Sequence, residues 1–133
     1  MIFVDTGAWV ARFSRRDQYH KRAAASWVKL KASTERIVTS DSVFAETITL
    51  LGRQVSPLAA VEAGRFLQEW NKLTILRATK DDEASALDLL DKFADQSIGF
   101  VDCLSFALMR RHRIPAAFTF DRHFELAGLP LFN

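Results

Sequence analysis

The sequence predicts an α/β fold in which helices cover the faces of a parallel sheet. Short apolar segments, typical of buried strands, alternate along the chain with longer segments whose apolar residues recur at helical spacing. Only five glycines and three prolines interrupt the 133 residues, and no repeat or linker is visible. Because this alternation favours parallel strands joined by helical crossovers, we expect a single domain over residues 1–133.

Four segments are predicted to form strands, and the tail Leu129–Phe132 is a candidate for a further short one. The four are Ile2–Val4, Arg36–Thr39, Leu73–Leu76 and Ala116–Phe120. In open α/β sheets, ligands bind outside the carboxyl ends of the strands. Asp5 follows the first of these strands and Asp121 follows the fourth. We therefore expect these two acids at the same edge of the sheet.

Helices are predicted between the strands, from periodicity and from capping residues. Their predicted places are from about Ala8, over His20–Lys31, after Ser40 or Asp41, from Ser56-Pro57, from Thr79, and over Val101–Arg111. Serine before Pro57 and a capping-box-like Thr79 with Asp82 are start signals. The segment Val101–Arg111 is apolar on nearly all sides, which predicts a central, largely buried helix.

Composition excludes several classes of protein. No apolar run approaches the roughly 20 residues that span a membrane, and residues 1–10 lack the basic region of a signal peptide. The single cysteine, Cys103, excludes an internal disulfide framework and a cysteine-based zinc site. We expect a protein of the reducing cytoplasm that does not enter a membrane.

The net charge is only +2, but the basic residues form two clusters. The clusters are Arg12, Arg15, Arg16, Lys21 and Arg22, and Arg110, Arg111, His112 and Arg113. Such clusters can follow the phosphates of a nucleic acid. Cations also suit the end of a helix that faces water. For either cluster alone, the solvated helix end is the favoured interpretation.

Four separated acids, each within apolar sequence, are the main indication of function. They are Asp5, Glu46, Asp102 and Asp121. An ionised carboxylate taken out of water costs several kcal/mol unless it is compensated. We therefore predict that the four surround a common cation. Carboxylate oxygens favour Mg²⁺ or Mn²⁺ over zinc, as one ion or as two about 3.5–4 Å apart. Such a site activates water and stabilises charge on a phosphoryl oxygen, which predicts phosphodiester chemistry.

Each acid also has a simpler interpretation. Glu46 could lie at the border of a buried helix face, Asp102 could favour a helix N-terminus, and Asp121 could cap a turn. Asp5 stands in Phe-Val-Asp-Thr-Gly-Ala, which matches the signature of aspartic proteases, where two aspartates share a proton. Those proteases consist almost entirely of strands, and a protease site leaves the other three acids unexplained.

The segments VDTGAWVA, AET, FVDCLSFALMRR and FTFDRHF resemble PIN-domain ribonucleases, and most of all the VapC toxins of toxin–antitoxin pairs. The resemblance covers nearly the whole chain. It implies an α/β/α sandwich, metal-dependent endonucleolytic cleavage of RNA, a homodimer and a cognate antitoxin. By position, Asp5 and Asp102 would be the principal Mg²⁺ ligands. Glu46 and Asp121 would complete the site or orient the attacking water, and Thr6 would support the site or contact a phosphate.

Two alternatives remain open at this point: a PIN-domain nuclease of RNA processing without an antitoxin, and a non-catalytic nucleic-acid-binding module. Several residues are set aside. The three histidines show no metal-ligand spacing, although His123 closely follows Asp121. Cys103 and Ser105 are interpreted as residues of a packed helix, and Asp95 as a solvated loop acid. The aromatic residues Trp9, Phe13, Trp27 and Trp70 are assigned to the core rather than to a partner surface.

Overall fold

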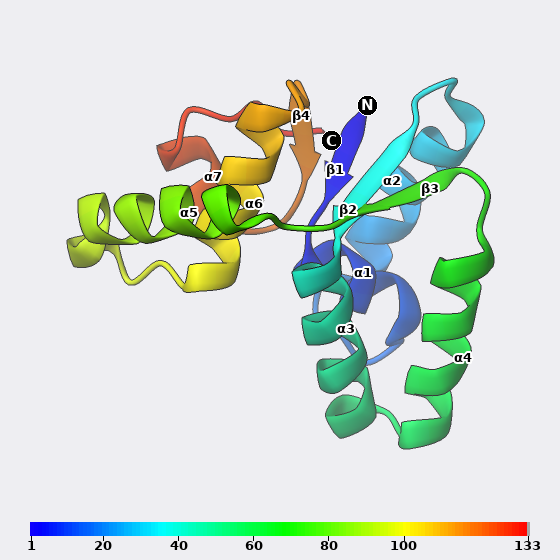
Figure 1. Cartoon of the computed structure of the whole chain (residues 1–133). Coiled ribbons are helices and arrows are strands. Elements are labelled where there is room, and N and C mark those ends of the chain that lie inside the picture. Colours follow the sequence, from blue (N-terminus) through cyan, green and yellow to red (C-terminus); the bar gives the residue numbers. More distant parts are fainter. Residues whose placement is uncertain (133) are drawn as a thin grey trace.

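A four-stranded parallel sheet lies at the centre of the computed structural model, which describes residues 1–132 (Figure 1). Its strands are β1 (Ile2–Val4), β2 (Ile37–Ser40), β3 (Leu73–Leu76) and β4 (Ala116–Phe118), in the order β3-β2-β1-β4. All three strand pairs are parallel. The predicted α/β fold with a parallel sheet is confirmed.

Seven α-helices and one short 3-10 turn complete the described part of the chain. They are α1 (Thr6–Phe13), α2 (His20–Ala32), α3 (Asp41–Gln54), α4 (Pro57–Glu69), α5 (Lys80–Lys92), η1 (Ala94–Gln96), α6 (Phe100–Arg111) and α7 (His123–Leu126). Figure 1 shows α5, α6 and α7 to the left of the sheet, while α3 and α4 extend below the sheet as a packed pair, with α4 on the right. None of the helices within residues 1–132 has the length and apolar composition required to cross a bilayer.

The register of β1 and β4 determines where their carboxyl ends lie. Ile2 pairs with Ala116 and Val4 pairs with Phe118, so both strands end at the same level. The expectation that the last strand continues to Phe120 is wrong, because β1 offers no partner beyond Val4. The expected strand at Leu129–Phe132 is reduced to one isolated bridge, between Leu131 and Ala117.

Helix starts agree with the capping signals, with one difference. Ser40 caps α3 by accepting a hydrogen bond from the amide of Val43, and the predicted capping box at Thr79 is present. The first helix was expected from about Ala8 but begins at Thr6. The reason is that the carbonyl oxygen of Asp5 accepts the amides of both Ala8 and Trp9, each at 3.2 Å.

The core lies between the sheet and the helices, and α6 contributes most densely to it. All seven residues from 103 to 109 are buried, as the apolar pattern of this helix predicted. Trp9 is fully buried, and its indole N–H donates to the Thr39 hydroxyl at 3.3 Å. Trp27 packs against Trp9 with ring centroids 4.9 Å apart. These two tryptophans therefore belong to the core, as expected, whereas Trp70 is only partly buried.

Arg12 does not belong to a solvated basic cluster, contrary to the sequence interpretation. Its guanidinium lies 4.9–5.8 Å from the centroids of four aromatic rings. The rings are those of Phe13, Trp27, Phe66 and Trp70. Cations are attracted to ring faces at such distances. Burial among the rings lowers the pKa of Arg12.

The pairing of α5 with α6 offers a stability test. The Thr79 hydroxyl caps α5 by accepting the Asp82 amide at 3.2 Å, and Asp82 also accepts two hydrogen bonds of 2.7 Å from Arg111 on α6. Thr79→Ala removes the cap, so we expect a loss of about 1 kcal/mol in the free energy of unfolding. Thermal unfolding measures the loss. Ser85→Ala, at an exposed position of the same helix, should leave stability unchanged or slightly raised.

Candidate active site

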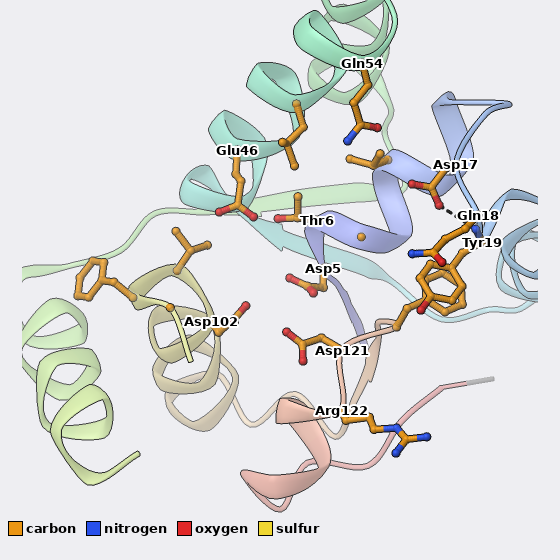
Figure 2. A pocket seen from close by; sticks show the side chains of 17 residues that line it. Asp5, Thr6, Asp17, Gln18, Tyr19, Glu46, Gln54, Asp102, Asp121 and Arg122 are labelled. Atoms are coloured by element: carbon orange, nitrogen blue, oxygen red, sulfur yellow. Dashed lines mark hydrogen bonds between the residues drawn. The ribbon is translucent and has the colours of Figure 1, made fainter. Parts of the chain in front are cut away.

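A cavity of about 660 Å³ opens beside the carboxyl ends of β1 and β4 (Figure 2). The four acids singled out from the sequence all line it, and so does Thr6. Two of the acids, Asp5 and Asp121, follow the adjacent strands β1 and β4, whereas Glu46 comes from α3 and Asp102 from α6. The structure therefore brings together residues that lie up to 116 positions apart in the chain.

Asp5 is the deepest of the four acids, with only 5% of its surface exposed. It occupies the position before α1 in an extended conformation, yet its side chain does not cap the helix. One carboxylate oxygen instead accepts a hydrogen bond of 2.9 Å from the Thr119 hydroxyl. Figure 2 shows the carboxylate directed into the cavity, toward Asp102 and Asp121.

Thr119 links two of the acids and was missed by sequence reasoning. Its hydroxyl donates to Asp5 and also accepts the backbone N–H of Asp121 at 3.0 Å. The side chain is 3% exposed, because it lies where the chain leaves β4. The only sequence signal is a hydroxyl residue two positions before an acid, which is too common to single out.

Asp102, Asp121 and His123 form a compact group. One ligand atom from each lies within 4.8 Å of the other two. Asp121 accepts from the backbone amide of His123 at 2.9 Å, and its Oδ1 also lies 2.9 Å from His123 Nδ1. His123 was set aside from the sequence because it lacks a regular metal-ligand spacing. Its separation of two residues from Asp121 was the available signal.

Glu46 lies in the same cavity but is exposed to solvent, and Asp102 and Asp121 are half-buried, so the expectation that all four acids are taken out of water holds fully for Asp5 alone. The buried face of α3 consists of Val43, Thr47 and Leu51, and Glu46 stands beside that face rather than on it. Figure 2 shows Glu46 on the wall opposite Asp102 and Asp121. The simpler interpretation of Glu46, as a residue at the border of the buried helix face that reaches water, therefore agrees with its exposure.

The cluster of carboxylates makes ionisation unfavourable. Burial, and next the charge of Asp102, raise the pKa of Asp5 from 3.8 to about 7. Burial, followed by the charges of Asp121 and Glu46, raises the pKa of Asp102 to about 6. None of the ion pairs within residues 1–132 involves Asp5 or Asp102. A cation in the cavity would remove this electrostatic cost.

The donor set fits a hard divalent cation. Carboxylate oxygens from four separate segments of the chain face one cavity, and oxygen ligands are those that Mg²⁺ and Mn²⁺ prefer. The Thr6 hydroxyl oxygen is buried and has no hydrogen-bond partner among the residues described. A buried polar atom without a partner is unfavourable. This oxygen lies at the cavity wall, where a bound water or phosphate oxygen would satisfy it.

Three residues set aside from the sequence lie where expected. Ser105 is buried and its hydroxyl donates to the carbonyl oxygen of Val101 at 3.0 Å. Cys103 is fully buried in the core. Asp95 is exposed and does not line the cavity.

Comparison with known proteins gives the family. A family model described as PIN domain matches residues 2–128. The chain belongs to the PIN-domain family. This PIN domain is 35% identical, over 96% of its length and 95% of the relative's, to the 23S rRNA-specific endonuclease VapC20 of Mycobacterium tuberculosis. The resemblance to PIN-domain proteins of the VapC type is therefore confirmed.

Two solved structures match the fold of this chain. The crystal structure of M. tuberculosis VapC20, described as a sarcin–ricin-loop-cleaving toxin, matches with a TM-score of 0.89 and 33% identity. The match covers 97% of this chain and 96% of that one. FitAcB from Neisseria gonorrhoeae matches with a TM-score of 0.73 over 100% and 97% of the two chains, but at 18% identity it supports the fold alone.

Proposed function

We propose that this PIN domain is a divalent-metal-dependent endoribonuclease that acts as the toxin of a toxin–antitoxin pair. The observation that carries the proposal is the cavity at the carboxyl ends of β1 and β4, where Asp5, Glu46, Asp102 and Asp121 converge. A module that only bound phosphates would gain nothing from four acids in one cavity, because like charges repel the phosphates. The similarity to VapC20 over nearly the whole chain supports the same activity.

We assign each acid a role in metal binding or in orienting water from its position in the cavity. Asp5 and Asp102, whose ionised forms are disfavoured by burial and by neighbouring charge, are the principal ligands of a Mg²⁺ or Mn²⁺ ion. Asp121, held by Thr119 and beside His123, completes the site. Glu46, which is exposed on the opposite wall, orients a water molecule toward the phosphate. Thr6 offers its unpaired hydroxyl to that water or to a phosphate oxygen.

The chemistry follows from this arrangement. A bound divalent cation supplies charge stabilisation to a phosphoryl oxygen and lowers the pKa of water. The protein contributes the fixed directions of the carboxylates, because Thr119 ties Asp5 to Asp121 through two hydrogen bonds. Holding the reacting groups in place accounts for much of the rate gain in such sites.

Ribosomal RNA is the first substrate class to test, because the relative is named for 23S rRNA. A cognate antitoxin and a homodimer are further parts of the proposal, supported by the similarity to VapC toxins. Helix α4 exposes Leu58, Val61 and Phe66, which gives an apolar surface on which a protein partner could pack.

Expression in growing cells tests the toxin role. We expect growth to stop when this protein is produced alone, and to resume when an adjacent antitoxin gene is co-expressed. Production of the Asp5→Asn protein at the same level should be harmless. Harmless production of the wild-type protein, together with metal-dependent RNA cleavage in vitro, would instead favour a role in RNA processing.

The link made by Thr119 gives a separate prediction. Thr119→Val keeps the side-chain shape but removes the hydrogen bonds to Asp5 and from Asp121. A hydrogen bond to a charged group contributes about 1.5–3 kcal/mol, so cleavage should slow by roughly 10- to 100-fold. Single-turnover kinetics with labelled RNA measures the change. Ser105→Ala, which loses only a bond to a helix carbonyl, should cleave at nearly the wild-type rate.

A further inference from the structure

A second cavity of about 370 Å³ adjoins the acidic one. The two share four lining residues: Tyr19, Phe120, Asp121 and Arg122. The two cavities differ in charge. Acids outnumber the single arginine, Arg122, in the first cavity, whereas Arg22 and Arg122 balance Asp121 and Glu125 in the second. Neither arginine belongs to an ion pair within residues 1–132, although Glu125 also lines this cavity. An RNA strand that leaves the acids can therefore meet two available cations at once.

An ordered aromatic pair forms part of the wall between the two cavities. The rings of Tyr19 and Phe120 are 4.5 Å apart and inclined by only 4°. Phe120 also meets the core ring of Phe118 edge-on at 5.8 Å. The backbone of Tyr19 is fixed because its amide donates to the Asp17 carboxylate at 2.9 Å (Figure 2). The pair is thus held from both sides and presents its remaining ring surface to the cavities.

Each arginine lies close in sequence to one member of this pair, since Arg22 is three positions after Tyr19 and Arg122 is two positions after Phe120. The Arg22 guanidinium lies 5.5 Å from the centroid of the Phe120 ring. Arg122 directly follows Asp121, yet Figure 2 shows its side chain extending away from the acids. Aromatic rings next to basic side chains are the usual means of holding single-stranded nucleic acid, by stacking and by phosphate contacts.

We propose that the second cavity is the subsite for a nucleotide next to the cleaved bond, with Arg22 and Arg122 holding its phosphate and the Tyr19–Phe120 pair supporting its base. The inference rests on the proposed function, since it assigns RNA as the ligand. It also explains how a polyanion approaches four acids: the affinity comes from the neighbouring cavity, and the acids act on the phosphate beside it. The two arginines and the two aromatic residues of the second cavity would thus bind substrate and take no part in the chemical step.

Binding to an inactive variant tests the subsite without requiring cleavage. In an Asp102→Asn background with Mg²⁺, fluorescence anisotropy follows a labelled single-stranded RNA of mixed sequence over a range of salt concentrations. Each phosphate contact to a single strand contributes about 0.7 to the slope of log K against log salt. The R22A/R122A substitutions should therefore make this negative slope shallower by about 1.4 and should weaken RNA binding at low salt at least tenfold. The matched control R65A/R110A removes two exposed arginines that line neither cavity.

The aromatic contribution is tested by two variants at one position. Tyr19→Leu should weaken binding about tenfold, because stacking of one base contributes roughly 1–3 kcal/mol. Tyr19→Phe keeps the ring and should bind as the parent does.

Equal slopes of log K against log salt for R22A/R122A and R65A/R110A would overturn the inference. So would unchanged RNA binding together with lost binding of the antitoxin, which would assign this surface to a protein partner. A wild-type protein that binds RNA through these arginines but never cleaves it would overturn the proposed function and leave the subsite intact.

Discussion

Asp102→Asn is expected to reduce the rate of RNA cleavage by at least about a thousandfold. The substitution keeps the shape of the side chain but removes a charge from the group formed with Asp121 and His123. A bound metal ion contributes several kcal/mol to such reactions, and each 1.36 kcal/mol corresponds to a factor of ten. The rate constant for cleavage of a labelled RNA, measured at saturating Mg²⁺, gives the effect directly.

The fold of this variant should remain intact, because Asp102 makes no ion pair in the described part of the chain. Burial and the neighbouring acids disfavour its ionised form, so without metal the variant should be at least as stable as the wild type at neutral pH. Asp95→Asn removes an exposed acid just before α6 and serves as the matched control. A folded Asp102→Asn protein with full activity would contradict the assigned site.

Without metal, the protein is expected to lose stability as the pH rises from about 4 to 7. The folded-state pKa of Asp5 is raised from 3.8 to about 7, and that of Asp102 to about 6. A carboxyl group whose pKa is higher in the folded than in the unfolded state stabilises the fold fully at pH values below its unfolded-state pKa. This stabilisation is lost as the pH rises through its folded-state pKa. For Asp5 the loss is at most about 4 kcal/mol. Chemical denaturation in EDTA at several pH values measures it.

Two comparisons isolate this effect from the other titrating groups. Asp5→Asn should show a smaller decline between pH 4 and 7 and should exceed the wild-type stability at pH 8 in EDTA. Excess Mg²⁺ or Mn²⁺ should stabilise the wild type at pH 8, because a ligand that binds only the folded state raises its stability. An Asp5→Asn protein with the same pH profile as the wild type would contradict the electrostatic account of the cavity.

Local signals were sufficient for the presence of the four strands, for most helices and for the placement of two acids. The capping serine of α3 and the capping box at Thr79 depend on a few neighbouring residues, which the sequence displays. The edge shared by Asp5 and Asp121 follows from parallel strands, because their carboxyl ends meet. Asp102 and Glu46 were grouped with these two because all four acids stand in apolar sequence, and the family resemblance implied the same four residues.

Features that depend on distant contacts were missed. The strand β4 ends at Phe118 because β1 ends at Val4, which no local pattern reveals. Thr119 and Asp5 are 114 positions apart, so their hydrogen bond is visible only in the fold. The partial burial of Arg12 was also missed, because three of its four ring partners, Trp27, Phe66 and Trp70, are distant in sequence and come from α2, α4 and the end of α4. In each case the deciding neighbour lies far away in sequence.

The most direct test of the central claim is cleavage of ribosomal and total cellular RNA by the purified protein, with Mg²⁺, with Mn²⁺ and with EDTA, alongside Asp5→Ala. The account predicts discrete fragments that require a divalent metal and disappear with the variant. Identical fragments from wild type and variant, or cleavage that persists in EDTA, would contradict it.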